Sequence, residues 1–377
     1  MIRTGANHGG RNFTESATGT EAGKFAADRN RKFTPAPERC PVLHSAWERS
    51  RSLLAAMRSA LENGLDKDAR AAVAMVAVAG SLGRMEATPQ SDCDLIVILH
   101  DEPPPSSTAA ERAYADVWKA LAPLGLPRPT AEGIYAAPTT RQRLLVEAQP
   151  GKIDEDLATF GTRFQLLLDA QPVFGNEEFL RLRNSVVDWY ASDYVAAAPH
   201  KEWSSLLNDL IRYFRSLCVT YQWGSLDAPP KWRLRNIKGR HSRLVMYAGL
   251  LFLLGESSRE QTNKVQWLKE RLSLTPLERI AWAYAEAGEP GFERIAECYE
   301  TFLTAVGDPQ LPVELAEEVA TADLPAEIAA RTVLPREQNA RYLGLKQNAD
   351  RLLRELLRFV LARTDHWSDR FLEYLLF

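Results

Sequence analysis

The chain has 377 residues, a formal net charge of −3 at pH 7, and a composition of 45% hydrophobic and 25% charged residues. This length predicts two or three domains with a substantial hydrophobic core, and the weak acidity excludes a generally basic nucleic-acid binder while leaving room for a local basic patch. The four cysteines are widely spaced and no apolar run reaches membrane-spanning length, so we expect a cytoplasmic protein with no membrane partner.

The N-terminal half begins with an unstructured pattern and continues as a small α/β domain. Residues 1–38 are rich in Gly, Thr, Asn and Arg and lack the apolar core of a secretory signal, which predicts a largely disordered tail. A helical pattern over 43–65 precedes "AAVAMVAVAGS", an apolar run typical of a buried strand, and "CDLIVIL", a β-branched second strand. A helix over 108–123 and a short third strand near 132–136 are expected next.

Beyond residue 150 the strand signals nearly stop, and the apolar residues follow helical spacing. The predicted fold class is therefore α+β, with a small mixed-sheet domain over 39–150 followed by an all-helical region. We divide that region into a helical domain over 151–256 and a C-terminal helical region over 257–377.

Two aspartates stand at the mouth of the second predicted strand. Residues two apart on a strand project to the same face, so Asp92 and Asp94 would point the same way and Cys93 the opposite way. Two neighbouring carboxylates repel each other and lose hydration, which is costly unless a cation offsets their charge. Mg²⁺ is the natural cation, because it prefers oxygen ligands and keeps substrate phosphates in its shell.

The turn after the first predicted strand supplies a phosphate-binding element. Gly80 has no Cβ, so the backbone can approach a ligand closely. Ser81 would begin a helix, where free amides and the helix dipole favour phosphate, and Arg84 would lie on the same side of the first turn. An Asp-x-Asp pair alone usually marks a solvated turn. Its position at the start of a core strand, a short loop after a Gly-Ser turn that itself ends an apolar strand, favours a functional site.

The stretch "GSLGRMEATPQSDCDLIVIL" resembles the signature of the DNA polymerase β-type nucleotidyltransferase superfamily. Within it, the pattern is similar to the branch of the nitrogen-regulatory-protein uridylyltransferase, the glutamine synthetase adenylyltransferase and related bacterial nucleotidyltransferases. The resemblance implies a palm-like sheet domain whose cleft is completed by the helices of 151–256. It also implies that two Mg²⁺ ions, or Mn²⁺ in their place, are held by Asp92 and Asp94.

The same resemblance assigns roles to the other motif residues. Gly80, Ser81 and Arg84 would hold the triphosphate, while Glu86 and Ser91 would support the loop. The superfamily normally has a third carboxylate on a later strand, and the best candidate is Glu132 in "TAEGIYAA". Glu132 could instead be an exposed turn residue. Its rivals are Asp154, Glu155 and Asp156, although their segment reads as a helix start with acids that complement the helix dipole.

The helical region contributes a basic segment by the same resemblance, which covers about 71–254. The branch pairs an Asn-x-Lys segment with its active site, and "RNIKGRHSR" supplies Asn236 and Lys238. Lys238, Arg235 and Arg243 are therefore candidates for phosphate contacts, against the alternative of a solvated basic helix end. Arg212 and Tyr213 are candidates to line the cleft. The chain departs from the full-length uridylyltransferase, because it has no His-Asp hydrolase motif and no length for regulatory modules.

Three functions are compatible with the sequence. The first is an enzyme that transfers NMP from an NTP, ATP among the candidates, to a hydroxyl of an acceptor, a protein being favoured over RNA or a small molecule. Asp92, Asp94 and Glu132 would be its catalytic carboxylates. The second is a toxin–antitoxin component acting on RNA, because Arg235 and His241 resemble the R-polar-x4–6-H motif of helical HEPN ribonucleases. The third is a nucleotide sensor that has lost catalysis.

Overall fold

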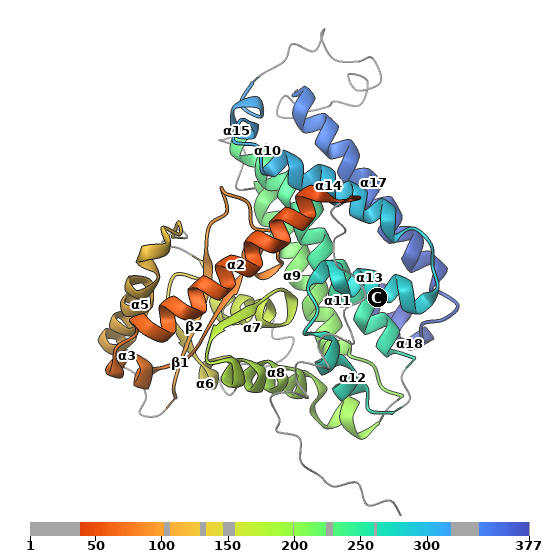
Figure 1. Cartoon of the computed structure of the whole chain (residues 1–377). Coiled ribbons are helices and arrows are strands. Elements are labelled where there is room, and N and C mark those ends of the chain that lie inside the picture. The colour runs from red at the N-terminus through yellow and green to blue at the C-terminus, as the bar shows by residue number, and fades with distance from the viewer. Residues whose placement is uncertain are drawn as a thin grey trace, which may run out of the picture.

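The computed structural model of the protein describes residues 38–101, 106–128, 133–145, 155–198, 200–223, 229–259, 262–317 and 339–376 (Figure 1). Three sequence predictions lie outside these ranges: the N-terminal tail up to residue 37, Glu132 and Asp154. The predicted α+β class is confirmed, since a small mixed sheet lies near the N-terminus and helices make up most of the chain that follows.

The sheet has four strands in the order β3-β2-β1-β4, with bounds β1 Val73–Ala79, β2 Asp94–Leu99, β3 Thr139–Thr140 and β4 Gln171–Phe174. β1 pairs antiparallel with β2 and β4, and β2 pairs parallel with β3. The register sets Ala79 opposite Asp94. The last residue of β1 and the first residue of β2 therefore lie side by side at the same end of the sheet.

Side-chain alternation gives the two sheet faces separate cores. Val76 and Val78 of β1 join Leu95 and Val97 of β2 in one core, while neighbouring residues of both strands, such as Ile96, join the other. Cys93 belongs to the first core, opposite Asp94, as the strand period predicts. The second core is continuous with the interior of the helical region. Asp94 thus starts its strand on the second face, the one that packs against the helical region beyond residue 150.

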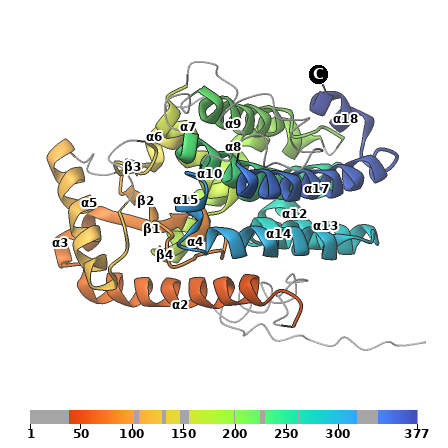
Figure 2. The ribbon, with the colours of Figure 1, turned by 90° about the horizontal axis from the view of Figure 1, so that it is seen from above.

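Three helices and a 3₁₀ turn cover the first face: α2 Pro41–Gly64, α3 Lys67–Ala72, α5 Ser107–Leu121 and η1 Ala122–Leu124. α2 buries Leu43, Trp47, Leu54 and Leu61, at the spacing that a single helical face requires. It runs along the sheet and continues past it, so that its N-terminal half lies beside the helical region (Figure 2).

The remaining helices form the other side of the molecule (Figures 1 and 2). In chain order their bounds are α4 Gly80–Gly83, α6 Arg141–Leu145, α7 Leu157–Leu168, α8 Asn176–Ala197, α9 Ser204–Trp223, α10 Pro229–Lys238, the π-helical turn η2 Gly239–Arg243, α11 Leu244–Ser257, α12 Lys264–Arg271, α13 Pro276–Ala287, α14 Phe292–Val306, α15 Leu311–Glu314, α17 Ala340–Ala362 and α18 Asp369–Leu376. In the part of the chain that the structure describes, no helix combines the length and the apolar character needed to span a membrane.

Two strand expectations need correction. The third strand expected near 132–136 is a turn over its described residues, because Gly133 has φ +100° and its carbonyl accepts a hydrogen bond from the amide of Ala136. The short β3 follows at Thr139–Thr140. β4 was missed, since its four residues directly follow the apolar helix α7 and carry a proline. It adds an edge strand to the sheet from beyond residue 150.

Candidate active site

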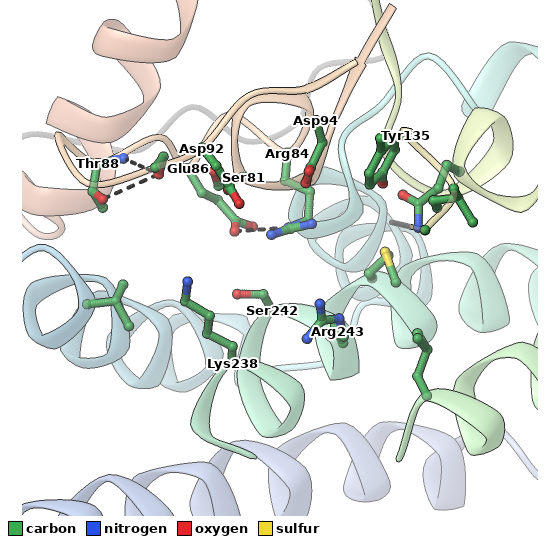
Figure 3. A pocket seen from close by; sticks show the side chains of 18 of the residues that line it. Ser81, Arg84, Glu86, Thr88, Asp92, Asp94, Tyr135, Lys238, Ser242 and Arg243 are labelled. Carbon is green, nitrogen blue, oxygen red and sulfur yellow. Dashed lines mark hydrogen bonds and ion pairs between the residues drawn. The ribbon is translucent and has the colours of Figure 1, made fainter. Parts of the chain in front are cut away.

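A cavity of about 450 Å³ lies between the helices and the end of the sheet at which β1 ends and β2 begins. Its acidic wall consists of Ser81, Asp92 and Asp94, from the turn after β1 and the start of β2. Its basic wall consists of Lys238, Ser242 and Arg243, from the end of α10 and the π-helical turn η2. The two walls lie across the cavity from one another (Figure 3). A π-helical turn is an uncommon element that often marks a functional position.

Gly80 makes room for Asp94. Its φ is +67°, a conformation that L side chains rarely adopt, and a Cβ built on it would lie 2.3 Å from Oδ2 of Asp94. The sequence predicted a close approach of the backbone to a ligand at this glycine. In the structure, the group that takes up the space of the missing side chain is the Asp94 carboxylate itself.

The two aspartates share the cavity but differ in surroundings. Asp92 is exposed, whereas Asp94 is partly buried at the head of its strand. Burial raises the pKa of Asp94 to about 7, and the nearby carboxylates of Asp92 and Asp169 add to the rise, against Arg84 and Arg243. An ionised Asp94 is therefore costly unless a positive charge approaches it. The cation expected beside this pair stays a prediction.

Arg84 lines the same cavity, but carboxylates already engage its guanidinium. Its Nε donates to Oε2 of Glu86 at 3.0 Å, and its Nη1 donates to Oδ2 of Asp169 at 2.7 Å. Burial opposes its charge, yet Glu86 and Asp169 outweigh burial and raise its pKa well above the ordinary value. Arg84 was expected to hold the triphosphate. Its observed contacts order the turn that carries Ser81, and the contact with triphosphate stays a prediction.

The loop between β1 and β2 is held by its own side chains and by α2. The hydroxyl of Ser91 accepts the Thr88 amide at 2.9 Å, and the hydroxyl of Ser50, on α2, accepts the Ala87 amide at 3.0 Å. The predicted loop-supporting role of Ser91 agrees with this contact. The loop therefore presents Asp92 from a fixed frame.

On the basic wall, Lys238 faces the acidic wall across the cavity (Figure 3). Its side chain is exposed to the cavity, where partial loss of hydration lowers the pKa of the ammonium group. The negative charge of Asp92 acts in the opposite direction. Arg243 also lines the cavity, and its expected contact with phosphate stays a prediction. Arg235 is exposed on α10 and does not belong to the cavity lining.

The far end of the cavity is apolar and aromatic. It includes Tyr135 from the turn before β3 and Tyr213 from α9, whose hydroxyl accepts a 2.5 Å hydrogen bond from the amide nitrogen of Gln165. Tyr213 was expected at the cleft. Arg212, expected beside it, is outside the lining and lies 3.7 Å from Glu155 and 3.4 Å from Asp209.

The two alternatives for a third carboxylate that lie within the described residues, Glu155 and Asp156, have other partners. Both oxygens of Glu155 accept hydrogen bonds from Arg163, at 2.6 and 2.7 Å. Asp156 caps α7 by accepting the Thr159 amide at 2.9 Å. Within the described residues, no group of three or more His, Cys, Asp or Glu side chains is arranged to hold a metal. The acid that sequence reasoning missed is Asp169, which is fully buried behind the acidic wall and has no local motif to mark it.

His241, on which the ribonuclease hypothesis depends, lies outside this cavity lining and is fully buried. Its ring stacks on Phe302 with the centroids 4.5 Å apart. Its Nδ1 lies 2.8 Å from the Ile237 carbonyl and its Nε2 lies 3.0 Å from the side-chain nitrogen of Asn348. Both ring nitrogens are thus occupied by the core, which does not suit an acid or base that must reach RNA.

The fold and the cavity together define a mixed α/β protein with an acid pair facing a basic wall. Residues 43–146 match the sequence model of a family described as "Putative nucleotidyltransferase DUF294". The matched segment runs from α2 to just beyond α6 and carries the whole acidic wall. It supports a nucleotidyltransferase at the level of the general class. No curated protein gives a significant match to the chain.

Proposed function

We propose that the protein is a metal-dependent nucleotidyltransferase that transfers NMP from an NTP to a hydroxyl group of an acceptor. The observation that carries this proposal is the pairing of Asp92 and Asp94 with Ser81 in one cavity, opposite Lys238 and Arg243. The family match over residues 43–146 supports the class of reaction. The similarity of the motif to the uridylyltransferase branch supports the motif roles.

The donor set fits Mg²⁺. Two carboxylates that project into one cavity offer the oxygen ligands that Mg²⁺ prefers, and the raised pKa of Asp94 indicates a carboxylate in need of a positive neighbour. Asp92 and Asp94 would hold the metal. When bound, Mg²⁺ would neutralise charge on the phosphates and polarise the reacting oxygens, as one ion or as a pair.

The side chains of the chain supply the remaining functions. The hydroxyl of Ser81 would bind a phosphate oxygen, and Lys238 and Arg243 would offset the charge that gathers on pyrophosphate as it leaves. The acceptor hydroxyl attacks the α-phosphorus, the bond to pyrophosphate breaks, and one of the carboxylates takes the hydroxyl proton. We favour a protein acceptor over RNA, because a net charge of −3 gives no general attraction to a polyanion.

The proposal is tested by labelling. Wild-type protein is incubated with Mg²⁺, a cell extract as the source of acceptor, and each of the four NTPs labelled at the α-phosphate. We expect one NTP to label an acceptor, and the double variant Asp92→Asn/Asp94→Asn to lower labelling at least about a hundredfold, because it removes both metal-binding charges.

The matched control is Asp68→Asn, which neutralises an exposed acid of the same sheet domain, on α3. It should label as the wild type does. Equal labelling by the wild type and the double variant would rule out the acid pair as the catalytic centre. Absence of labelling in every arm, together with absence of NTP binding, would rule out the enzyme.

A further inference from the structure

A buried tyrosine of the C-terminal region contacts the site from behind. Tyr299 lies on α14, is fully buried, and donates a 2.5 Å hydrogen bond from its hydroxyl to Oε1 of Glu86. Glu86 belongs to the turn of residues 80–86 that follows β1, so this contact joins positions 213 residues apart in the sequence. Phe302, Leu303 and Val306 of the same helix line the cavity. α14 is therefore one of the walls of the site.

The contact continues through a chain of buried charges. Oε2 of Glu86 accepts from Nε of Arg84 at 3.0 Å, and Nη1 of Arg84 donates to Asp169 at 2.7 Å. The backbone amide of Gly80 donates a hydrogen bond to the Asp169 carboxylate, which lowers its pKa, whereas burial has the larger effect and raises it. The series from Tyr299 to Gly80 thus ends at the glycine whose open space the Asp94 carboxylate occupies.

Tyr299 also faces the basic wall. Burial raises the pKa of its hydroxyl well above the ordinary value and Glu86 adds to the rise, whereas Arg84 and the side chain of Ser242 lower it. Ser242 is part of the π-helical turn that carries Arg243. One hydroxyl thus lies between the turn of the acidic wall and the turn of the basic wall.

The turn that Tyr299 contacts has a conformation that must be held. Met85, between Arg84 and Glu86, has φ +64°, which is unfavourable for a residue with a long side chain. Such a conformation persists only where the surrounding contacts determine it. The hydrogen bond from Tyr299 and the ion pairs of Arg84 are the contacts that fix the side chains on either side of Met85.

We propose that Tyr299 is a positioning residue of the nucleotide site. Its hydrogen bond holds the 80–86 turn against α14, so that a helix of the C-terminal region contributes to nucleotide binding. The inference rests on the proposed nucleotidyltransferase function. It assigns a role to a helix in the region 257–377, for which the sequence alone gave none.

The test measures NTP binding by titration calorimetry, with Mg²⁺ present and no acceptor, for the NTP that the wild type binds most tightly. We expect Tyr299→Phe to raise the dissociation constant about tenfold, because it removes a hydrogen bond to a buried carboxylate that orders the phosphate-binding turn. The matched control is Tyr284→Phe on α13. It removes the hydroxyl of another buried tyrosine, which donates to the Glu355 carbonyl at 2.9 Å, and should leave the constant within about twofold.

A double-variant cycle separates positioning from general destabilisation. Glu86→Gln should also weaken binding about tenfold or more, because it removes the charge that accepts from both Tyr299 and Arg84. The double variant should weaken binding by less than the product of the two single effects, because the two substitutions share the Tyr299–Glu86 contact. A merely structural loss would lower the number of binding sites and leave the dissociation constant unchanged. If Tyr299→Phe is poorly folded, Glu86→Gln tests the same contact from the other side.

The outcomes are distinguishable. A wild type that binds an NTP while Tyr299→Phe and Glu86→Gln bind it as Tyr284→Phe does would overturn this inference and leave the proposed function intact. Independent effects that multiply to about a hundredfold in the double variant would also overturn it. A wild type that binds none of the four NTPs would overturn the proposed function, and the inference with it.

Discussion

Gly80 illustrates how a missing side chain shapes the acidic wall. The strand register places Ala79 opposite Asp94, so the next residue meets the Asp94 carboxylate at close range. A glycine is needed there for two reasons: the positive φ and the lack of space for a Cβ. The sequence predicted the glycine's importance, but it attributed the close approach to a ligand rather than to the protein's own carboxylate.

We predict that Gly80→Ala destabilises the protein and abolishes NTP binding, since the new methyl would collide with Asp94. Gly288→Ala is the control, because Gly288 has the same φ of +67° and no atom lies within 4 Å of the place that its Cβ would take. The control should cost about 1 kcal/mol from backbone strain alone, and Gly80→Ala about 1–3 kcal/mol more. Urea unfolding of both variants measures the difference. Equal costs would show that the close approach to Asp94 does not matter.

Among the elements, α2 begins without a cap of its own. Its N-cap residue, Cys40, makes no side-chain capping bond, and its first residue is a proline. The carboxylate of Glu300, on α14, supplies the cap instead: its two oxygens accept the amides of Val42 and Leu43, each at 2.8 Å. A carboxylate at a helix N-terminus also complements the helix dipole. α14 therefore anchors the helix that spans the sheet, as well as forming a wall of the cavity.

We expect Glu300→Ala to lower the free energy of unfolding by about 1–2 kcal/mol, because two amides at the start of α2 lose their acceptor. Glu297→Ala, an exposed acid one turn earlier on α14, serves as the control and should change stability by less than about 0.5 kcal/mol. Thermal or urea unfolding provides the measurement. An effect no larger than that of the control would mean that water replaces the cap without loss.

At the scale of the whole molecule, His241 makes the free energy of unfolding fall at acidic pH. It lies where the π-helical turn, α14 and α17 meet, and burial lowers its pKa to about 4. Its Nδ1 donates to a carbonyl, so its Nε2 is the acceptor for Asn348. Protonation would place two donors face to face. The pKa of His241 in the folded protein lies below its unfolded value of about 6.5. The stability contributed by the neutral ring is therefore complete above pH 6.5 and is lost as the pH falls towards 4.

The wild type should therefore lose about 2 kcal/mol of stability through this group between pH 8 and pH 5. His241→Gln keeps a polar side chain that does not titrate, and its stability should change less over the same interval, although it is lower at pH 8. Urea unfolding at pH 8, 6.5 and 5 compares the two proteins. Parallel pH profiles would show that other groups control the acid sensitivity.

The sequence was sufficient for the parts of the molecule that local pattern encodes. Apolar runs predicted β1 and β2, and strand period predicted that Cys93 lies on the face opposite Asp94, because alternation is a property of the backbone. Contacts between distant segments have no such signal. Asp169, Tyr299 and Glu300 look like ordinary residues of helical or loop segments. Only the packing of the chain brings Asp169 and Tyr299 to the 80–86 turn and Glu300 to the start of α2.

The cap that Glu300 provides has a consequence for synthesis of the protein. The acceptor for the Leu43 amide lies 257 residues later in the chain, and Tyr299 precedes it by one position. At a translation rate of about 5–20 residues per second, the nascent sheet domain would wait roughly 13–50 s before these partners leave the ribosome. During that interval α2 has an open N-terminus and the 80–86 turn lacks its support. The start of α2 and the 80–86 turn therefore gain these contacts only when α14 has been synthesised.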